Sequence, residues 1–178
     1  MSYTLPSFAA RVREVLQQDN TPVGREQVTA LLRDALQDRA FVESLFDAAS
    51  PERKIVYEDP QLGFCILAHR YTDAKKGPPH DHGPSWAIYG QADGETVMSD
   101  WVTVDAASPG RVRKLREYTL TPGLARLYNE GDIHAPSRTL RGGCPFFARL
   151  HTGGAMWNSS ATSPSNCCCN ERANSPSV

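Results

Sequence analysis

From Arg53 onward the chain consists of short runs rich in Val, Ile, Tyr, Phe and Trp, separated by Gly, Pro and Asp. Runs of this kind between turn residues are typical of β-strands. They recur about every 8 to 12 residues, which favours a sandwich or a barrel, and no helix-length pattern interrupts them. We therefore predict a mainly β fold without crossover helices. The predicted strands are Lys54–Glu58, Gly63–Tyr71, Ser85–Tyr89, Glu95–Val104, Val112–Leu120, Leu124–Tyr128 and Phe146–His151.

The first fifty residues have a different pattern, in which apolar residues such as Phe8, Val12 and Leu16 recur at helical spacing. Thr21-Pro22 is a helix-start signal. The apolar face of such helices needs a partner, so we expect residues 1–50 to form a helical segment packed on a barrel at 51–157. Residues 158–178 are mostly Ser, Asn, Pro and Cys. Because they offer little apolar surface to bury, we predict a disordered tail there.

The charge is nearly balanced, with 20 acidic and 19 basic residues and a net charge of −1. This balance gives no electrostatic basis for binding nucleic acid or anionic lipid. No apolar run approaches the roughly 18 residues that cross a bilayer, and the N-terminus lacks the pattern of a secretory signal. We expect a cytoplasmic monomer or homodimer whose partners are small molecules. Its cysteines are then expected to be thiols, with metal binding by the last three as the alternative: Cys65, Cys144, Cys167, Cys168 and Cys169.

Two histidines, His80 and His82, lie two positions apart between Gly77-Pro78-Pro79 and Gly83-Pro84. Residues at this spacing share one face of a strand, with their Cα atoms roughly 7 Å apart. Two imidazoles can then lean toward one metal ion at about 2.1 Å. Random placement of the five histidines gives roughly 0.1 such pairs, so the spacing alone is a weak signal.

A third histidine, His134, strengthens the signal because it also follows a turn and precedes a strand-like stretch, in Gly131-Asp132-Ile133-His134. It lies 52 residues after His82, which is long enough for several hairpin strands to return the chain to the same barrel. We therefore predict that His80, His82 and His134 bind one metal ion. The alternative is a barrel without metal, in which these turn histidines are solvated.

These two segments resemble the motifs of the cupin superfamily. The first cupin motif is a glycine-rich approach to His-X-His followed by a glutamate and a later glycine, and it is similar to residues 77–94. The second is a Pro/Gly approach to a third histidine, similar to residues 122–134. The glutamate ligand of the family would fall at Trp86 or Ala87 and is absent. The resemblance implies a double-stranded β-helix barrel with three histidine ligands and open metal positions.

Among cupins, the chain most resembles the thiol dioxygenases, the cysteine dioxygenase group, which also use three histidines without the glutamate. The strand Gly63–Tyr71 and the sequence His80-Asp81-His82 carry this likeness. It implies a non-haem Fe(II) enzyme that adds O₂ to a small thiol and gives a sulfinic acid. Neutral imidazoles also suit other ions, so zinc, nickel, copper and manganese stay open as alternatives.

The resemblance also suggests roles for residues around the metal. His151 is similar to a relay histidine of the group and receives a catalytic role, with a solvent-facing histidine as the alternative. Lys54 stands where the group has an arginine that binds the substrate carboxylate, which implies a substrate-binding role. Its ammonium offers a single point charge in place of the planar, bidentate guanidinium. Ala87 stands near the cysteine that animal enzymes crosslink to a tyrosine, so a site without the crosslink is implied.

Two aromatic residues, Trp86 and Tyr89, follow the histidine pair closely. Ligand pockets are mostly apolar with a few polar groups, so we predict that both line the substrate cavity. Filling of the barrel interior is the alternative.

Three other functions are compatible with the same residues. A cupin oxygenase can act on a carbon substrate such as a diketone or a ring-cleavage substrate. A non-catalytic cupin can bind a small ligand or regulate a partner. A zinc-dependent isomerase or hydrolase would act without oxygen.

Overall fold

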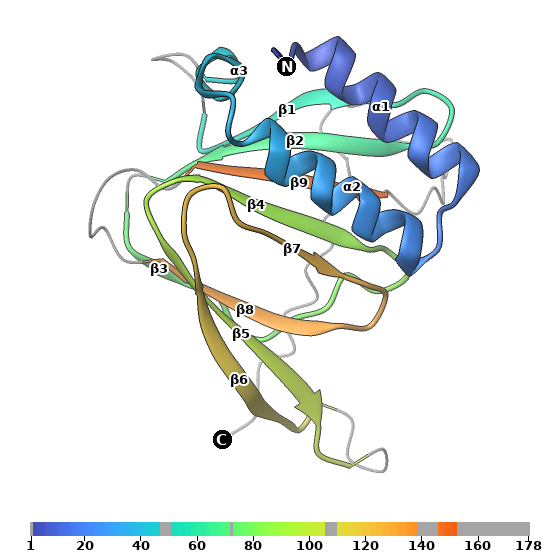
Figure 1. Ribbon diagram of the computed structural model, residues 1–178. Coiled ribbons are helices and arrows are strands. Elements are labelled where there is room, and N and C mark those ends of the chain that lie inside the picture. Colours follow the sequence, from blue (N-terminus) through green and yellow to red (C-terminus); the bar gives the residue numbers. More distant parts are fainter. Residues whose placement is uncertain (1, 47–50, 72, 106–109, 139–145, 153–178) are drawn as a thin grey trace, which may run out of the picture.

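The computed structural model describes residues 2–46, 51–71, 73–105, 110–138 and 146–152, the last range by its backbone. Two antiparallel sheets follow three N-terminal helices (Figure 1). The helices are α1 (Leu5–Gln18), α2 (Pro22–Ala35) and α3 (Arg39–Ser44). The strands are β1 (Arg53–Glu58), β2 (Phe64–Arg70), β3 (Lys75–Lys76), β4 (Ala87–Asp93), β5 (Thr96–Thr103), β6 (Val112–Leu120), β7 (Ala125–Tyr128), β8 (Ile133–Arg138) and β9 (Phe146–Thr152).

The order of the strands shows how the sheets form a barrel. The five-stranded sheet has the order β1-β2-β9-β4-β7, and the four-stranded sheet has the order β3-β8-β5-β6. Consecutive strands β4 and β5 belong to different sheets, and so do β6 and β7, so the chain passes repeatedly between the two layers. This arrangement confirms the predicted mainly β class and agrees with a double-stranded β-helix barrel.

Local signals explain where the helices begin. Thr4 caps α1 through a capping box with Ser7, and Thr21-Pro22 starts α2 as predicted. Helix α2 lies close to β4 because Gly90 has no side chain: a Cβ there would lie 2.8 Å from Leu32 and from Leu36. The helices lie against the five-stranded sheet (Figure 1), and buried side chains of both belong to one core.

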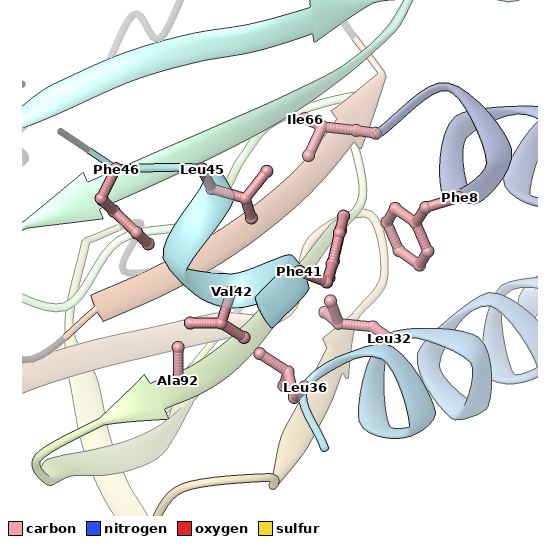
Figure 2. Close-up of a pocket in the computed structure, with 9 residues that line it drawn as sticks. All are labelled: Phe8, Leu32, Leu36, Phe41, Val42, Leu45, Phe46, Ile66 and Ala92. Atoms are coloured by element: carbon pink, nitrogen blue, oxygen red, sulfur yellow. The ribbon is translucent and has the colours of Figure 1, made fainter. Parts of the chain in front are cut away.

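Two separate clusters of buried side chains lie on the two faces of the five-stranded sheet. Ile88 belongs to the core between sheet and helices, whereas its neighbours Ala87 and Tyr89 belong to the cluster inside the barrel. This is the alternation expected of a strand that is covered on both faces. Apolar side chains around one small cavity of the helix–sheet core are drawn in Figure 2: Phe8, Leu32, Leu36, Phe41, Val42, Leu45, Phe46, Ile66 and Ala92. Its volume of about 10 Å³ makes it a packing gap of the core.

All seven predicted strands are present, and β3 and β8 were missing from the prediction. The omission of β8 matters because this strand carries His134. Pro136 within it lacks a backbone N–H, which argues against a strand when only the sequence is considered. Strand β4 continues to Asp93, past the predicted end at Tyr89, although Gly90 weakens strand propensity there.

Several sequence predictions concern residues beyond these ranges. The predicted tail 158–178 lies outside the described residues, as do Cys144 and Cys167–Cys169. Cys65 is buried in β2. None of the described helices has the length and apolar character that a membrane crossing requires.

Candidate metal centre

His80 and His134 form one rung of an antiparallel pair. The N–H of each residue donates to the carbonyl of the other, and both distances are 2.9 Å. In such a hydrogen-bonded pair the Cα atoms lie about 5.5 Å apart and both side chains point to the same face. The backbone therefore sets two imidazoles side by side although they are 54 residues apart in sequence.

A turn after His80 brings His82 to the same place. The carboxylate of Asp81 accepts a hydrogen bond from the N–H of Gly83 at 2.8 Å, and Gly83 has a φ of 58°. Residues other than glycine rarely adopt this backbone conformation. The ring centroids of His82 lie 5.3 Å from His80 and 5.0 Å from His134, and those of His80 and His134 are 4.6 Å apart. The three predicted metal ligands thus form one cluster.

The donor atoms of this cluster suit a metal ion. One ring nitrogen from each histidine lies within 4.8 Å of the other two. The Nδ1 atoms of His80 and His134 face backbone carbonyls, those of Pro78 at 3.0 Å and Asp132 at 3.3 Å. A carbonyl accepts only, so these Nδ1 atoms carry the proton and each Nε2 keeps its lone pair. Histidine ligands of metals are commonly oriented in this way.

The Nε2 atom of His80 has the burial and the open lone pair of a metal-binding nitrogen. It is buried, and no described residue offers it a hydrogen bond. Buried polar atoms nearly always have a partner, and an unsatisfied one costs about 1–3 kcal/mol. A metal ion bound between the three rings would use this lone pair. The cluster can therefore hold a metal ion.

Tyr89 is the one predicted substrate residue that the structure brings to the histidines. Its hydroxyl lies 3.1 Å from Nε2 of His82. Its ring makes an edge contact with His134 at a centroid distance of 5.4 Å. Its neighbour Ala87 faces the same barrel interior and has no atom that binds metal, as expected from the absent glutamate.

Trp86 lies elsewhere. It is buried in the core between the sheet and the helices, and the guanidinium of Arg25 sits 5.5 Å from its ring centroid. Strand alternation explains this position, since residues before and after an inward-facing Ala87 point outward. The position does not support the predicted role of Trp86 in the substrate cavity, and it agrees with a packing role.

Lys54 is also remote from the histidines. Strands β2 and β9 lie between β1 and β4, a separation of roughly 14 Å at 4.8 Å per strand. In the register Lys54 lies opposite Ala68, which belongs to the core under the helices. Opposite residues share a face, so Lys54 occupies the face that carries the helices and not the barrel interior. This position does not support the predicted role in binding a carboxylate.

His151 is placed by its backbone alone. It pairs with Cys65 of β2 on one side and with Ala87 of β4 on the other, and Ala87 pairs in turn with Tyr128. The register thus puts His151 one strand away from a residue that faces the barrel interior. Its catalytic role stays a prediction.

Tyr128 is a site residue that the sequence analysis missed. Its ring stacks on that of His134, with centroids 3.9 Å apart and an angle of 19° between the planes. Burial raises the pKa of Tyr128 far above its ordinary value, so the phenol stays protonated. A single tyrosine in a strand belongs to no motif. The available signal was its position at the end of the predicted strand Leu124–Tyr128.

Comparisons with known proteins return solved structures of low sequence identity and low TM-score. No family model matches the chain, and no curated protein sequence matches it. Among solved structures, KdgF from Halomonas sp. is 19% identical with a TM-score of 0.40, covering 59% of this chain and 82% of that one. An uncharacterized conserved protein with a double-stranded beta-helix domain from Klebsiella pneumoniae is 16% identical with a TM-score of 0.44, covering 64% and 84%. A cupin superfamily protein from Desulfitobacterium hafniense is 16% identical with a TM-score of 0.39, covering 61% and 84%.

Proposed function

We propose that this chain is a cupin-type non-haem Fe(II) dioxygenase that adds O₂ to a small thiol and gives a sulfinic acid. The observation that supports this most is the convergence of three imidazoles, His80, His82 and His134, around a buried and unpaired Nε2. Thiol plus O₂ balances as sulfinic acid, with both oxygen atoms on sulfur.

The charge of the ligand set favours a thiol substrate. Within the described ranges the cluster contains no carboxylate, so three neutral donors leave the full charge of a divalent ion in place. When bound, iron would supply the redox chemistry, and a thiol bound at a divalent ion is deprotonated. Three ligands also leave coordination positions for substrate and oxygen.

Tyr89 is the residue we assign to substrate binding. Its hydroxyl lies 3.1 Å from Nε2 of His82, so it stands directly beside the three histidines. A substrate oxygen, such as a carboxylate oxygen, can accept from it at the rim of the site. Tyr89 would thereby orient the substrate relative to the open positions.

Apolar and aromatic side chains around the histidines would exclude water from the reaction. Met98, Tyr128 and Tyr89 belong to the buried cluster inside the barrel, and His134 is fully buried beside the two tyrosines. Exclusion of water from this side of the site strengthens electrostatic interactions and protects reactive species from hydrolysis. His151 remains our candidate for a proton carrier, since its strand borders Ala87.

The test begins with metal analysis of protein purified without an affinity tag, because a histidine tag would itself bind metal. The protein is then loaded with Fe(II) without oxygen and assayed in an oxygen electrode against small thiols, diketones and ring-cleavage substrates. We expect one equivalent of iron and oxygen uptake with a thiol, whose product gains two oxygen atoms by mass spectrometry.

Each other result would point to a different function. Oxygen uptake with carbon substrates alone would assign the chain to that class of oxygenase. Metal well below one equivalent together with no oxygen uptake would indicate a non-catalytic binding protein. Turnover without oxygen would indicate an isomerase or hydrolase. Any of these three outcomes contradicts the proposal.

A further inference from the structure

Tyr128 makes the closest ring contact of His134 and is itself held by a chain of hydrogen bonds. The stacked pair is almost completely buried, with Tyr128 2% and His134 0% exposed. The hydroxyl of Tyr128 lies 2.5 Å from that of Tyr118, which donates to Asp100 at 3.1 Å. Two side chains, Tyr128 and Tyr118, thus connect the imidazole of His134 to the carboxylate of Asp100.

The direction of this chain follows from its last member. A carboxylate only accepts, so the hydroxyl of Tyr118 donates its hydrogen bond to Asp100 and its oxygen accepts a hydrogen bond from the hydroxyl of Tyr128. A tyrosine hydroxyl is protonated at neutral pH, so each of the two phenols has one hydrogen to donate. The chain therefore runs one way, from Tyr128 to Asp100.

Asp100 is in turn fixed by two arginines. Its carboxylate accepts from Nε of Arg116 at 2.6 Å and lies 3.7 Å from a guanidinium nitrogen of Arg126. Both guanidinium groups lie over the ring of Tyr118, at 5.4 and 5.7 Å from its centroid. The acceptor end of the chain is thus held from two sides.

The same residues link the two sheets through a ring of contacts. Asp100 of β5 lies opposite His134 of β8 in the register. Tyr118 belongs to β6 in the same sheet, whereas Tyr128 belongs to β7 in the other sheet. The stacking of Tyr128 on His134 completes this ring of contacts. It therefore ties the position of one imidazole to both layers of the barrel.

We propose that Tyr128 is a positioning residue for His134, and that the Tyr118–Asp100 chain holds Tyr128 in place and makes its ring a better partner for a metal-bound imidazole. This inference rests on the proposed metal-binding function. A phenol that donates toward a carboxylate-anchored chain carries more negative charge. An electron-rich ring face attracts a group that has become positive.

The geometry of the other ligands explains why His134 needs this contact. His80 is oriented by a carbonyl at 3.0 Å, whereas the corresponding contact of His134 is longer, at 3.3 Å. The parallel ring of Tyr128 is a further contact that restricts rotation of the imidazole of His134.

The test uses Co(II) as a visible probe for the histidine site, measured in the full chain. Tyr128→Leu removes the stacked ring. Tyr128→Phe and Tyr118→Phe keep the rings and break the same chain at different points. Tyr57→Phe is the matched control, because this tyrosine also bonds a carboxylate, that of Asp59 at 3.0 Å, away from the histidines.

We expect Tyr128→Leu to weaken Co(II) binding roughly tenfold, which is the scale found when supporting residues around a metal site are changed. It should also shift the visible band of bound Co(II). The two phenylalanine variants should show a smaller loss of about threefold, equal to each other within error. Tyr57→Phe should lower the melting temperature without changing affinity or band.

Two results would overturn the inference, and they can be told apart. Unchanged Co(II) affinity and band position in all three chain variants would refute the positioning role while leaving the metal site intact. Failure of the wild-type protein to bind Co(II) would refute the metal site and the inference with it. If Tyr128→Leu does not fold, the two phenylalanine variants decide the matter on their own.

Discussion

Arg25 of helix α2 donates a hydrogen bond to Glu130 at 2.7 Å, four residues before His134 in the chain. The same guanidinium reaches Asn129 at 3.3 Å and lies over the ring of Trp86. A residue of the helical segment thus holds the turn between β7 and β8. Its hydrogen bond lowers the pKa of Glu130, so the pair is charged at neutral pH.

Arg25→Lys should loosen this turn, because lysine keeps the charge and loses the planar fork that contacts several groups. We expect a loss of about 1–2 kcal/mol in the free energy of unfolding. Metal affinity should fall a few-fold, since the turn leads into His134. Urea unfolding and a Co(II) titration measure the two effects. Arg39→Lys is the control, because its pair with Glu43 is exposed and lies on one helix. Equal behaviour of the two variants would argue against a role for Arg25 in the site.

Removing a metal ligand should abolish iron binding without unfolding the protein. His80→Ala and His134→Ala each take one of the three donors, so we expect loss of bound iron and of oxygen uptake, with the helical circular dichroism signal retained. His69→Gln serves as the control for iron content, since this buried histidine bonds the hydroxyl of Tyr71 at 2.8 Å and lies outside the cluster. Full iron content in the purified His80→Ala or His134→Ala protein would be incompatible with the proposed site.

Comparing Gly83→Ala with Gly63→Ala should show whether the turn at Gly83 positions His82 for metal binding. At a φ of 58° an alanine is strained although nothing lies within 4 Å of its Cβ, so we expect a cost of about 1–2 kcal/mol. Gly63→Ala has a similar φ of 66° and equally open surroundings, away from the histidines. Both variants should lose similar stability in thermal unfolding, but only Gly83→Ala should lose Co(II) affinity, because its turn positions His82. The same affinity in both variants would count against that coupling.

Asp59 should make the folded protein sensitive to acid. Burial by itself raises the pKa of this carboxyl, but hydrogen bonds from the N–H of Leu62, from Arg13 and from the N–H of Gln61 outweigh burial and lower it. A carboxyl with a lowered folded-state pKa stabilises the protein above its unfolded pKa of about 3.9, and this stabilisation is lost as the pH falls through the folded-state pKa.

Asp59→Asn therefore should destabilise the protein at neutral pH and lose part of the difference from wild type in acid. Urea unfolding of both proteins between about pH 7 and pH 3 measures this difference. A constant difference across the range would show that the charge of Asp59 does not stabilise the fold.

The sequence by itself indicated the helical segment, most of the strands and the histidines of the candidate metal site. Helix signals such as Thr21-Pro22 and the runs from Arg53 onward depend on neighbours in the chain, so they predicted a helical N-terminal segment and seven strands that the structure contains. His80 and His82 were found in the same way, because their shared face follows from a spacing of two. Histidine could be chosen as a candidate donor because donor chemistry depends on residue type.

The tertiary structure decided which of these residues meet. The rung that joins His80 to His134 and the ring contact of Tyr128 depend on strand register, which couples residues far apart in sequence. Register and sheet order also place Lys54 and Trp86 away from the histidines, although their residue types suit a pocket. Alternation along a strand defines two faces, but only the packing of helices on one sheet and of the second sheet on the other selects which face becomes the interior.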